Sequence, residues 1–282
     1  MKFVALMLLL ILGRYRSHPR WAEKWGRQNL IPGTGFNWFA VLLCVAIAEY
    51  LLLQTSGLFW AGLILAAEIV LLYLLLPHWS AFDIKGEYYT DWCRGDYQAA
   101  FLDLSDKLSL PKTESLDDCR EVHYAVCHSY VTRSLIGFFT LLLWFFLLGM
   151  PGVFIALWAL WLSPSQTSVG GIHRLARLIC WLPGLLLGFT FFAVGNGRGA
   201  YDCLQRSREQ NDSDWLFAVA LGAIGDNHFS SQCSLDELCD EEFRHHAADE
   251  INALVVLIRR SAVLWLIMFG VFTMIGFESP LY

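Results

Sequence analysis

Residues 136–162 read IGFFTLLLWFFLLGMPGVFIALWALWL and contain no charged residue. A helix that crosses a bilayer needs about 20 apolar residues, so this stretch is long enough to span one. Gly149-Met150-Pro151-Gly152 interrupts it near its centre. In lipid, such a break is tolerated where neighbouring helices, side chains or water satisfy the freed backbone groups. The stretch therefore predicts either a broken helix inside a bundle or beside a polar cavity, or a simple proline kink in a structural span.

The composition of the whole chain indicates the same class of protein. Of its 282 residues, 56% are hydrophobic and 16% are charged, whereas a soluble domain carries about 25% charged residues. We therefore expect an integral membrane protein, and the 12 tryptophans and 20 phenylalanines suit lipid-facing surfaces and aromatic belts. The formal net charge is −6 and no long run of lysine and arginine occurs, which argues against nucleic acid as a partner.

Four further apolar stretches, residues 36–53, 57–76, 179–194 and 261–277, accompany the first one. Together they predict an all-α, polytopic membrane protein with about five spanning helices. Residues 1–12 (MKFVALMLLLIL) lack a small-residue cleavage site, so we expect a retained N-terminal helix that is too short to span. Basic residues cluster between residues 14 and 27, which places that segment in the cytoplasm by the positive-inside rule.

The chain is predicted to have six sections. They are residues 1–35, an N-terminal interfacial helix and basic segment; 36–76, a transmembrane hairpin; 77–135, a cytoplasmic helical section; 136–194, transmembrane segments with the Gly-Met-Pro-Gly break; 195–260, a second cytoplasmic helical section; and 261–282, the last transmembrane helix. His173, Arg174 and Arg177 conflict with this topology, because they fall on the periplasmic side of the fourth span. Either these charges have a role, or the third segment is re-entrant and both of its ends share a side.

Helix start signals mark both polar sections. Asp96 is predicted to be the N-cap of a helix that continues as QAAFLDLSDKL, and Ser115 to be the N-cap of a second helix that continues towards residue 136. In the later section, Ser234 and Glu237 match a capping box. We expect one helix from there into the last span, with Arg259-Arg260 at its membrane boundary.

Several polar residues in or near the spans are candidates for ligand binding. Glu68 lies inside the second span, where a carboxylate normally faces a partner or a cavity; the alternative is a protonated carboxyl group that is hydrogen-bonded within the bundle. Glu121, His128 and Arg133 approach the third span, and Glu121 and His128 share a helical face beside Tyr124. His128 is suited to proton transfer near neutral pH. The alternative for these residues is a polar helix face with an arginine at the headgroups.

Other sequence patterns are weaker indications of a functional site. Cys239, His245, His246 and Asp249 have helical spacings that suit metal ligands, but the acidic run around them is typical of a solvated face, so we assign no metal. The glycine-rich stretch of residues 195–199 lacks the Lys-Ser/Thr of a phosphate loop and favours a helix end. Of the eight cysteines, Cys44 and Cys180 lie in apolar stretches and are expected to be small core residues. The other six have no paired spacing and are expected to be free thiols on a reducing side. With no nucleophile elbow, HExxH or CxxC, we assign no catalytic residue.

Four stretches together resemble the AmpE family of inner-membrane proteins, which is related to the CobD/CbiB membrane proteins of cobalamin synthesis. They are Arg94-Gly95-Asp96 with Gln98-Ala99-Ala100, the aromatic-rich residues 139–152 that end in Gly-Met-Pro-Gly, the Trp-Leu-Pro segment in residues 177–187, and RRSAVLWL at residues 259–266. They cover most of the chain in the order of the family. The resemblance adds Arg94 and Asp96 to the candidate ligand-binding residues, and Pro151 as the centre of the broken span.

This resemblance implies a multi-pass protein of the bacterial inner membrane that regulates β-lactamase induction, and hence antibiotic resistance, alongside peptidoglycan-recycling signals. Its partners would be the lipid bilayer and a cell-wall fragment or nucleotide ligand. The CobD/CbiB side implies instead an enzyme that uses a nucleotide with Mg²⁺. The chain departs from that side at two places. His128-Ser129-Tyr130-Val131-Thr132-Arg133 stands where a Glu-Asn-x-x-Asp-Gly-type element is expected, and the apolar residues 156–161 (ALWALW) replace the polar Asn, Asp and Lys residues of the synthetases. We therefore expect a regulatory or signalling protein rather than a synthetase, with no cofactor.

Overall fold

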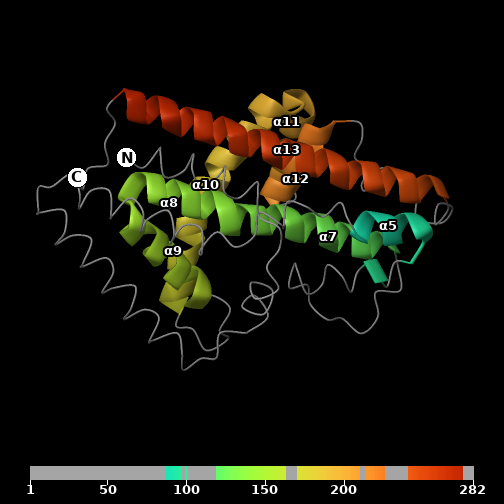
Figure 1. Cartoon of the computed structure of the whole chain (residues 1–282), viewed down its shortest axis with the longest axis horizontal. Helices are drawn as coiled ribbons and strands as arrows, with labels where there is room; N and C mark the ends of the chain where they lie inside the picture. The colour runs from blue at the N-terminus through green and yellow to red at the C-terminus, as the bar shows by residue number, and fades with distance from the viewer. Residues whose placement is uncertain are drawn as a thin grey trace, which may run out of the picture. The chain divides into compact units, whose positions relative to one another are not determined.

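The computed structural model describes residues 87–96, 99–100, 119–162, 170–209, 214–225 and 241–275 (Figure 1). These residues form helices and turns, and no strand occurs among them, as the predicted all-α class requires. The helices are α5 (Glu87–Arg94), α7 (Cys119–Ser134), the π-helix η2 (Leu135–Thr140), α8 (Leu141–Leu148), α9 (Met150–Leu162), α10 (Gly170–Val194), α11 (Gly197–Glu209), α12 (Trp215–Ile224) and α13 (Glu241–Met274). The predicted hairpin of residues 36–76, with Glu68, lies outside the described residues, as do Ser115 and the capping box at Ser234.

The chain divides into two compact units. Unit 1 comprises Met1–Trp79, Thr140–Ile179 and Leu266–Tyr282, and unit 2 comprises Ser80–Phe139 and Cys180–Trp265. Three described helices are long and apolar enough to cross a membrane: Val122–Leu148, Arg177–Val194 and His245–Phe272. The first has 27 residues and therefore a length of roughly 40 Å, against about 30 Å for the hydrocarbon core.

Of the two alternatives predicted for residues 136–162, the structure shows the broken helix and not the simple proline kink, because no continuous helix covers this stretch. The long apolar helix starts earlier, within α7, and runs through η2 and α8 to Leu148. The predicted continuation of the polar helix into this stretch is confirmed. Hydropathy alone favoured the uncharged window, whereas the partly polar α7 is helical because its apolar side packs in the core of unit 2.

In unit 1, Gly149 ends α8 and separates it from α9. Its φ of 72° lies in the left-handed region that favours glycine, and its N–H donates to the Phe145 carbonyl at 2.8 Å. Pro151 then falls in the first turn of α9, where helical N–H groups have no intrahelical partner in any case. The predicted break is confirmed, but it is a turn between two helices that removes no internal hydrogen bond, rather than a gap within one helix.

Pro183 lies inside α10 and removes the N–H that would otherwise bond to the carbonyl of Ile179. In unit 1, the indole Nε1 of Trp144 donates a hydrogen bond to this carbonyl at 3.1 Å. A side chain of α8 thus replaces the missing backbone donor, which is how a proline is accommodated in an apolar helix. The end of α10 at Val194 agrees with the predicted end of the fourth span, and its start at Gly170 is nine residues earlier than predicted.

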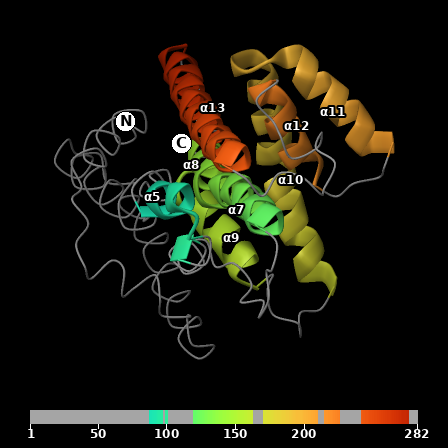
Figure 2. The same ribbon diagram turned by 90° about the vertical axis from the view of Figure 1, so that its right-hand side faces the viewer.

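In unit 2, α7 and the first part of α13 lie side by side and run in the same direction (Figures 1 and 2). Contacts advance along both helices together, from His123 with Glu250 to the edge-to-face rings of Phe139 and Trp265. The polar beginnings of the two helices therefore meet at one end of this unit. α13 is continuous from Glu241 to Met274, which confirms the predicted single helix through Arg259-Arg260 into the last apolar stretch.

The hairpin of α11 and α12 completes unit 2 and is held by close backbone packing. Gly199 and Gly222 face each other, and a Cβ on either one would collide with the backbone carbonyl of the other. The side chain of Asn196 accepts a hydrogen bond from the Gly199 N–H at 3.2 Å, while the Asn196 N–H donates to Ala223 at 2.7 Å. The glycine-rich stretch is therefore a helix end and start, as the sequence favoured, and it also brings the two helices together.

Trp215 anchors α12 on α10. Its ring lies against Gly184 and Gly188, two glycines four residues apart that leave a groove on the α10 surface. This contact fixes the start of α12, so its neighbours Asp214 and Phe217 are brought to α7.

Candidate functional site

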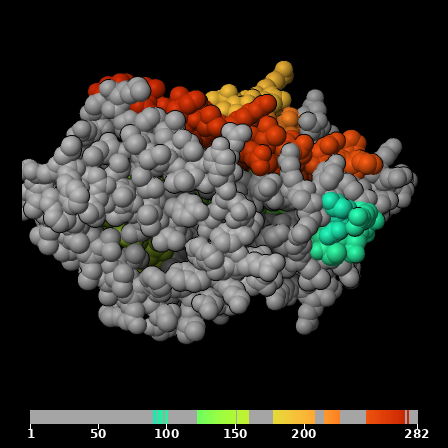
Figure 3. All heavy atoms as spheres, in the orientation of Figure 1, coloured from blue at the N-terminus to red at the C-terminus, as the bar shows by residue number. Residues whose placement is uncertain are grey.

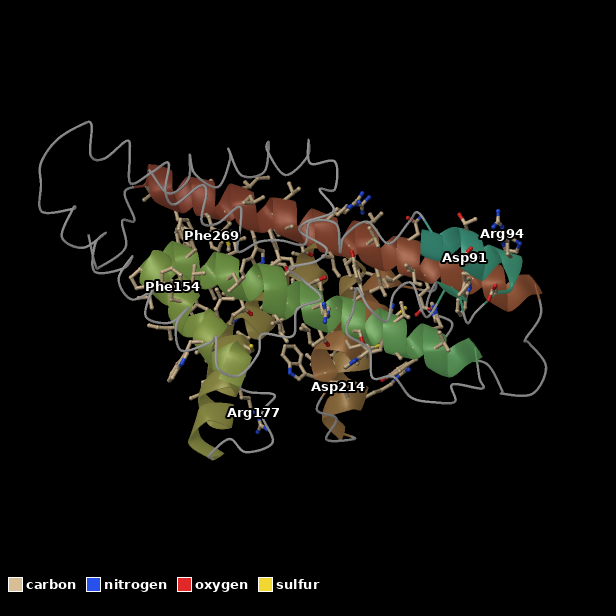
Figure 4. All side chains as sticks on the ribbon, turned by 60° about the horizontal axis from the view of Figure 1, so that its bottom comes forward. Asp91, Arg94, Phe154, Arg177, Asp214 and Phe269 are labelled. Atoms are coloured by element: carbon tan, nitrogen blue, oxygen red, sulfur yellow. The ribbon has the colours of Figure 1, made fainter. Side chains whose placement is uncertain are left out.

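Arg94-Gly95-Asp96 forms a helix stop and a helix start in immediate succession. The Asp96 N–H donates to the Asp91 carbonyl, and the Gly95 N–H donates to the Trp92 carbonyl, both at 3.0 Å. Gly95 has a φ of 81°. These features define a Schellman C-cap at the end of α5. The Asp96 carboxylate accepts a hydrogen bond from the Ala99 N–H at 3.0 Å. The predicted N-cap is therefore confirmed. Arg94 is exposed and projects outward from α5 (Figure 4).

A buried polar cluster lies where α5, α7 and α13 meet in unit 2. His123 Nε2 and Glu250 Oε2 are hydrogen-bonded at 3.3 Å, and the two side chains are only 3% and 1% exposed. The buried Cys127 thiol lies 3.6 Å from the same His123 nitrogen. The ring of Trp92, which is fully buried, lies 5.6 Å from the His123 ring. The cluster joins the helix that carries Arg94 to the two long helices.

A second polar cluster, on another face of α7, is open to solvent. His128 Nε2 lies 3.3 Å from Asp214 Oδ2, and these side chains are 31% and 45% exposed. The Tyr124 ring is nearly parallel to the His128 ring, and both are perpendicular to the buried Phe217 ring, with centroids 5.1 and 5.3 Å from it. We call Tyr124, His128, Asp214 and Phe217 the open cluster.

The local sequence explains why two histidines of one helix serve two clusters. His123 and His128 are five residues apart, so they point about 140° apart around α7, one towards α13 and the other towards α12. Asp214 occupies the N-cap position of α12 but makes no capping hydrogen bond with its side chain. Its carboxylate is instead available to His128, and Figure 4 shows it at the start of α12 beside α7.

The candidates predicted from the sequence are distributed as follows. His128 belongs to the open cluster, and Arg133 is half-buried further along α7. Glu121 is in the first turn of α7, and the structure does not describe its side chain. Arg94 and Asp96 are exposed at the end of α5. Pro151 belongs to unit 1, whereas the residues of both clusters belong to unit 2. Glu68 lies outside the described residues.

Sequence reasoning missed the buried pair and the partner of His128. A signal for Glu250 was present, because it is in register with Leu254 and Ile258 on the apolar face of α13, where a carboxylate needs a partner. His123 is likewise in register with the buried residues Cys127 and Tyr130. Asp214 had no such signal, because the sequence before it is polar and its role depends only on the packing of α12.

Among the described residues, no group of three or more His, Cys, Asp or Glu side chains is placed to hold a metal ion. His245, His246 and Asp249 are exposed on α13, as a solvated face predicts, and Cys239 lies outside the described residues. Cys127 and Cys203 are free thiols, as expected from the absence of paired spacing.

Both clusters are built from residues that are far apart in sequence. Both include residues from the polar first parts of α7 or α13, and each of these helices continues into an apolar stretch. Comparisons with protein-family models, with curated proteins and with solved structures find no match to this chain. The fold and site therefore define a helical protein with membrane-length apolar helices and histidine–carboxylate clusters at their polar ends.

Proposed function

We propose that this chain is a multi-pass protein of the bacterial inner membrane with about five spanning helices, and that it acts as an AmpE-like regulator of β-lactamase induction. In this proposal the open cluster, with Arg133 nearby on α7, binds a ligand or partner at the cytoplasmic membrane face. The ligand class that fits the resemblance is a cell-wall fragment or a nucleotide. The bilayer is the second partner.

The surface of α13 carries the membrane part of this proposal. Among the side chains that the structure describes here, the exposed ones before residue 261 are polar: His245, His246, Asp249, Asn252, Arg259 and Arg260. Those after it are apolar: Val263, Ile267, Val271, Phe272 and, just past the end of the helix, Ile275. A continuous exposed apolar ladder is unfavourable in water and suits lipid. The change of character at Arg260 suits a membrane boundary, where arginine reaches the headgroups.

α10 supports the same setting. Beyond Arg177, its exposed residues are apolar, namely Leu178, Trp181, Phe189 and Ala193, whereas the residues exposed just after its end, Asn196 and Arg198, are polar. Two helices that are distant in sequence therefore each have an apolar exposed surface that meets a polar one at a definite residue. Such a change is expected of helices that leave a bilayer.

The open cluster supports the binding part. It offers an imidazole, a carboxylate and an aromatic ring that are all accessible, whereas the buried pair of His123 and Glu250 is shielded from solvent. Accessible polar groups held by a rigid scaffold are the usual components of a binding site. Arg94-Gly95-Asp96, in contrast, already has a structural explanation as a helix cap.

Two experiments test this proposal. Deleting the gene should alter β-lactamase inducibility or the pool of cell-wall fragments, and wild-type behaviour in both assays would reject the regulatory role. Purified protein in detergent should be stabilised by a muropeptide or a nucleotide, and Asp214→Asn should abolish that stabilisation while Asp249→Asn, on the exposed polar face of α13, preserves it. Equal responses of the two variants would reject the open cluster as the binding site.

The second candidate is a membrane enzyme of CobD/CbiB descent that acts on a nucleotide- or phosphate-bearing amphiphile. It is favoured by one observation, the contact of His128 with Asp214, because a carboxylate that orients an imidazole is a common acid–base arrangement. Turnover of a nucleotide with Mg²⁺ that depends on His128 would favour this candidate over the regulator.

A further inference from the structure

Among residues 197–207 of α11, whose side chains the structure describes, the exposed ones form one stripe. Arg198, Tyr201, Asp202, Gln205 and Arg206 are exposed, and their spacings of three, one, three and one residues place them on a single helical face. The opposite face contains the buried Ala200 and Ser207. Figure 3 shows α11 at the molecular surface.

The direction of this stripe is fixed rather than free to rotate. The close approach of Gly199 and Gly222 leaves no room for a Cβ between α11 and α12, so α11 can pack on α12 only by the face that carries Gly199. The two hydrogen bonds of Asn196 fix the start of α11 relative to the end of α12. The residues of the stripe are therefore presented together.

The stripe also follows directly from an apolar helix. The exposed surface of α10 is apolar as far as Ala193, and α11 begins at Gly197, four residues later. A helix that leaves a bilayer and is followed at once by another helix brings the second helix to the level of the headgroups. Tyrosine and arginine are the residue types expected at that level.

We propose that α11 is a membrane-surface helix whose stripe binds the phosphate groups of anionic phospholipids through Arg198 and Arg206. This inference rests on the proposed membrane setting but not on the regulatory role or on the open cluster. The exposed Tyr201 rests among the headgroups at one edge of the stripe.

Charge and spacing determine what the stripe accepts. Its two arginines and one aspartate give it a net charge of +1, in a chain whose overall charge is −6, so it attracts anionic lipid locally. Arg198 and Arg206 are eight residues apart, roughly 12 Å along the helix, so they contact two separate headgroups. Guanidinium groups match phosphate geometry, and the attraction weakens with salt.

The test uses the purified full chain in mixed phosphatidylcholine–phosphatidylglycerol micelles, with thermal unfolding as the readout. Phosphatidylglycerol should raise the midpoint of the wild-type protein. In the variant Arg198→Gln/Arg206→Gln, the lipid should bind more weakly by roughly fivefold per arginine removed. Arg94→Gln removes another exposed arginine, at the end of α5, and should leave the lipid effect unchanged.

Three results would overturn the inference: no effect of phosphatidylglycerol on the wild type, the same response in the double variant, or an equal loss in Arg94→Gln. Stabilisation by free glycerol 3-phosphate that matches that of the lipid would also overturn it, because it would indicate a soluble phosphate site. Failure of the membrane setting is recognised separately, since the chain would then remain dispersed in buffer without detergent.

Discussion

The indole of Trp144 donates a hydrogen bond to the carbonyl of Ile179, the group that Pro183 leaves without its helical donor. The proline and the tryptophan are 39 positions apart in the printed sequence, and neither explains the other until α8 and α10 pack together. The pair shows how an apolar helix of this chain can carry a proline without an unsatisfied carbonyl.

Trp144→Phe should therefore destabilise the protein by about 1–3 kcal/mol, because the Ile179 carbonyl loses its donor in an apolar setting. Thermal unfolding in detergent measures the loss. In a Pro183→Ala background, the new alanine supplies a backbone N–H for that carbonyl, and the same tryptophan substitution should cost less. An identical cost in both backgrounds would mean that the hydrogen bond is not what Trp144 contributes.

Glu250→Ala should destabilise unit 2 by about 3–5 kcal/mol, since it breaks a buried pair and leaves His123 without its partner carboxylate. Glu250→Gln should cost less, because the amide still offers a hydrogen-bonding oxygen. The neighbouring Asp249 is exposed, and Asp249→Asn should stay within about 0.5 kcal/mol of wild type in the same unfolding measurement. A similar cost at positions 249 and 250 would contradict the buried cluster.

Gly199→Ala and Gly222→Ala should each separate α11 from α12, because the added methyl group meets the opposing backbone. Overpacking of this kind costs about 1–3 kcal/mol. Gly137 is exposed and a Cβ there meets nothing within 4 Å, so Gly137→Ala provides a matched control that is neutral or stabilising. The hairpin packing is wrong if all three variants unfold at the same temperature.

Asp96→Ala should cost about 1 kcal/mol through the lost N-cap, and Asp96→Asn should recover most of it because asparagine caps equally well. This comparison separates a structural role of Asp96 from a ligand-binding one. Loss of ligand-dependent stabilisation in Asp96→Asn, with normal stability of the free protein, would show that the carboxylate charge serves binding as well.

The rate at which the Cys203 thiol of α11 is alkylated should depend on pH and on its two charged neighbours. Burial raises the pKa of its thiol, Arg206 opposes this shift and Asp202 adds to it. Since the thiolate is the reactive form, alkylation of Cys203 at neutral pH should be slower than that of an exposed thiol and should accelerate only at higher pH. Asp202→Asn should speed the reaction and Arg206→Gln should slow it. Peptide mass spectrometry measures the alkylation of Cys203. The opposite order of rates in the two variants would contradict the effects assigned to Asp202 and Arg206.

Local chemistry made part of this structure predictable. The Asp96 cap, the break at Gly149 and the end of α10 at Val194 each depend on residues that are adjacent in sequence. The continuous α13 followed from a helical pattern with no proline between Glu241 and Met274. Glycine, proline and capping side chains act over a few residues, so a single sequence reveals them.

The features that could not be predicted from the sequence depend on tertiary packing. His123 and Glu250 are 127 residues apart, and only the parallel packing of α7 and α13 makes them partners. The long apolar helix includes α7 because the apolar side of α7 is buried, while its polar side is not. A hydropathy average along the sequence does not distinguish these two sides. Asp214 has the sequence pattern of an ordinary N-cap, and its contact with His128 exists because Trp215 is seated on α10.

The most direct test of the central claim is a spin-label scan of the exposed face of α13 in lipid vesicles, in a background without native cysteines. Labels at Val263, Ile267 and Val271 should be accessible to oxygen and protected from a water-soluble nickel reagent, whereas a label at Asn252 should show the reverse. Equal access of the nickel reagent to all four positions would contradict the account, because the apolar ladder would then face water.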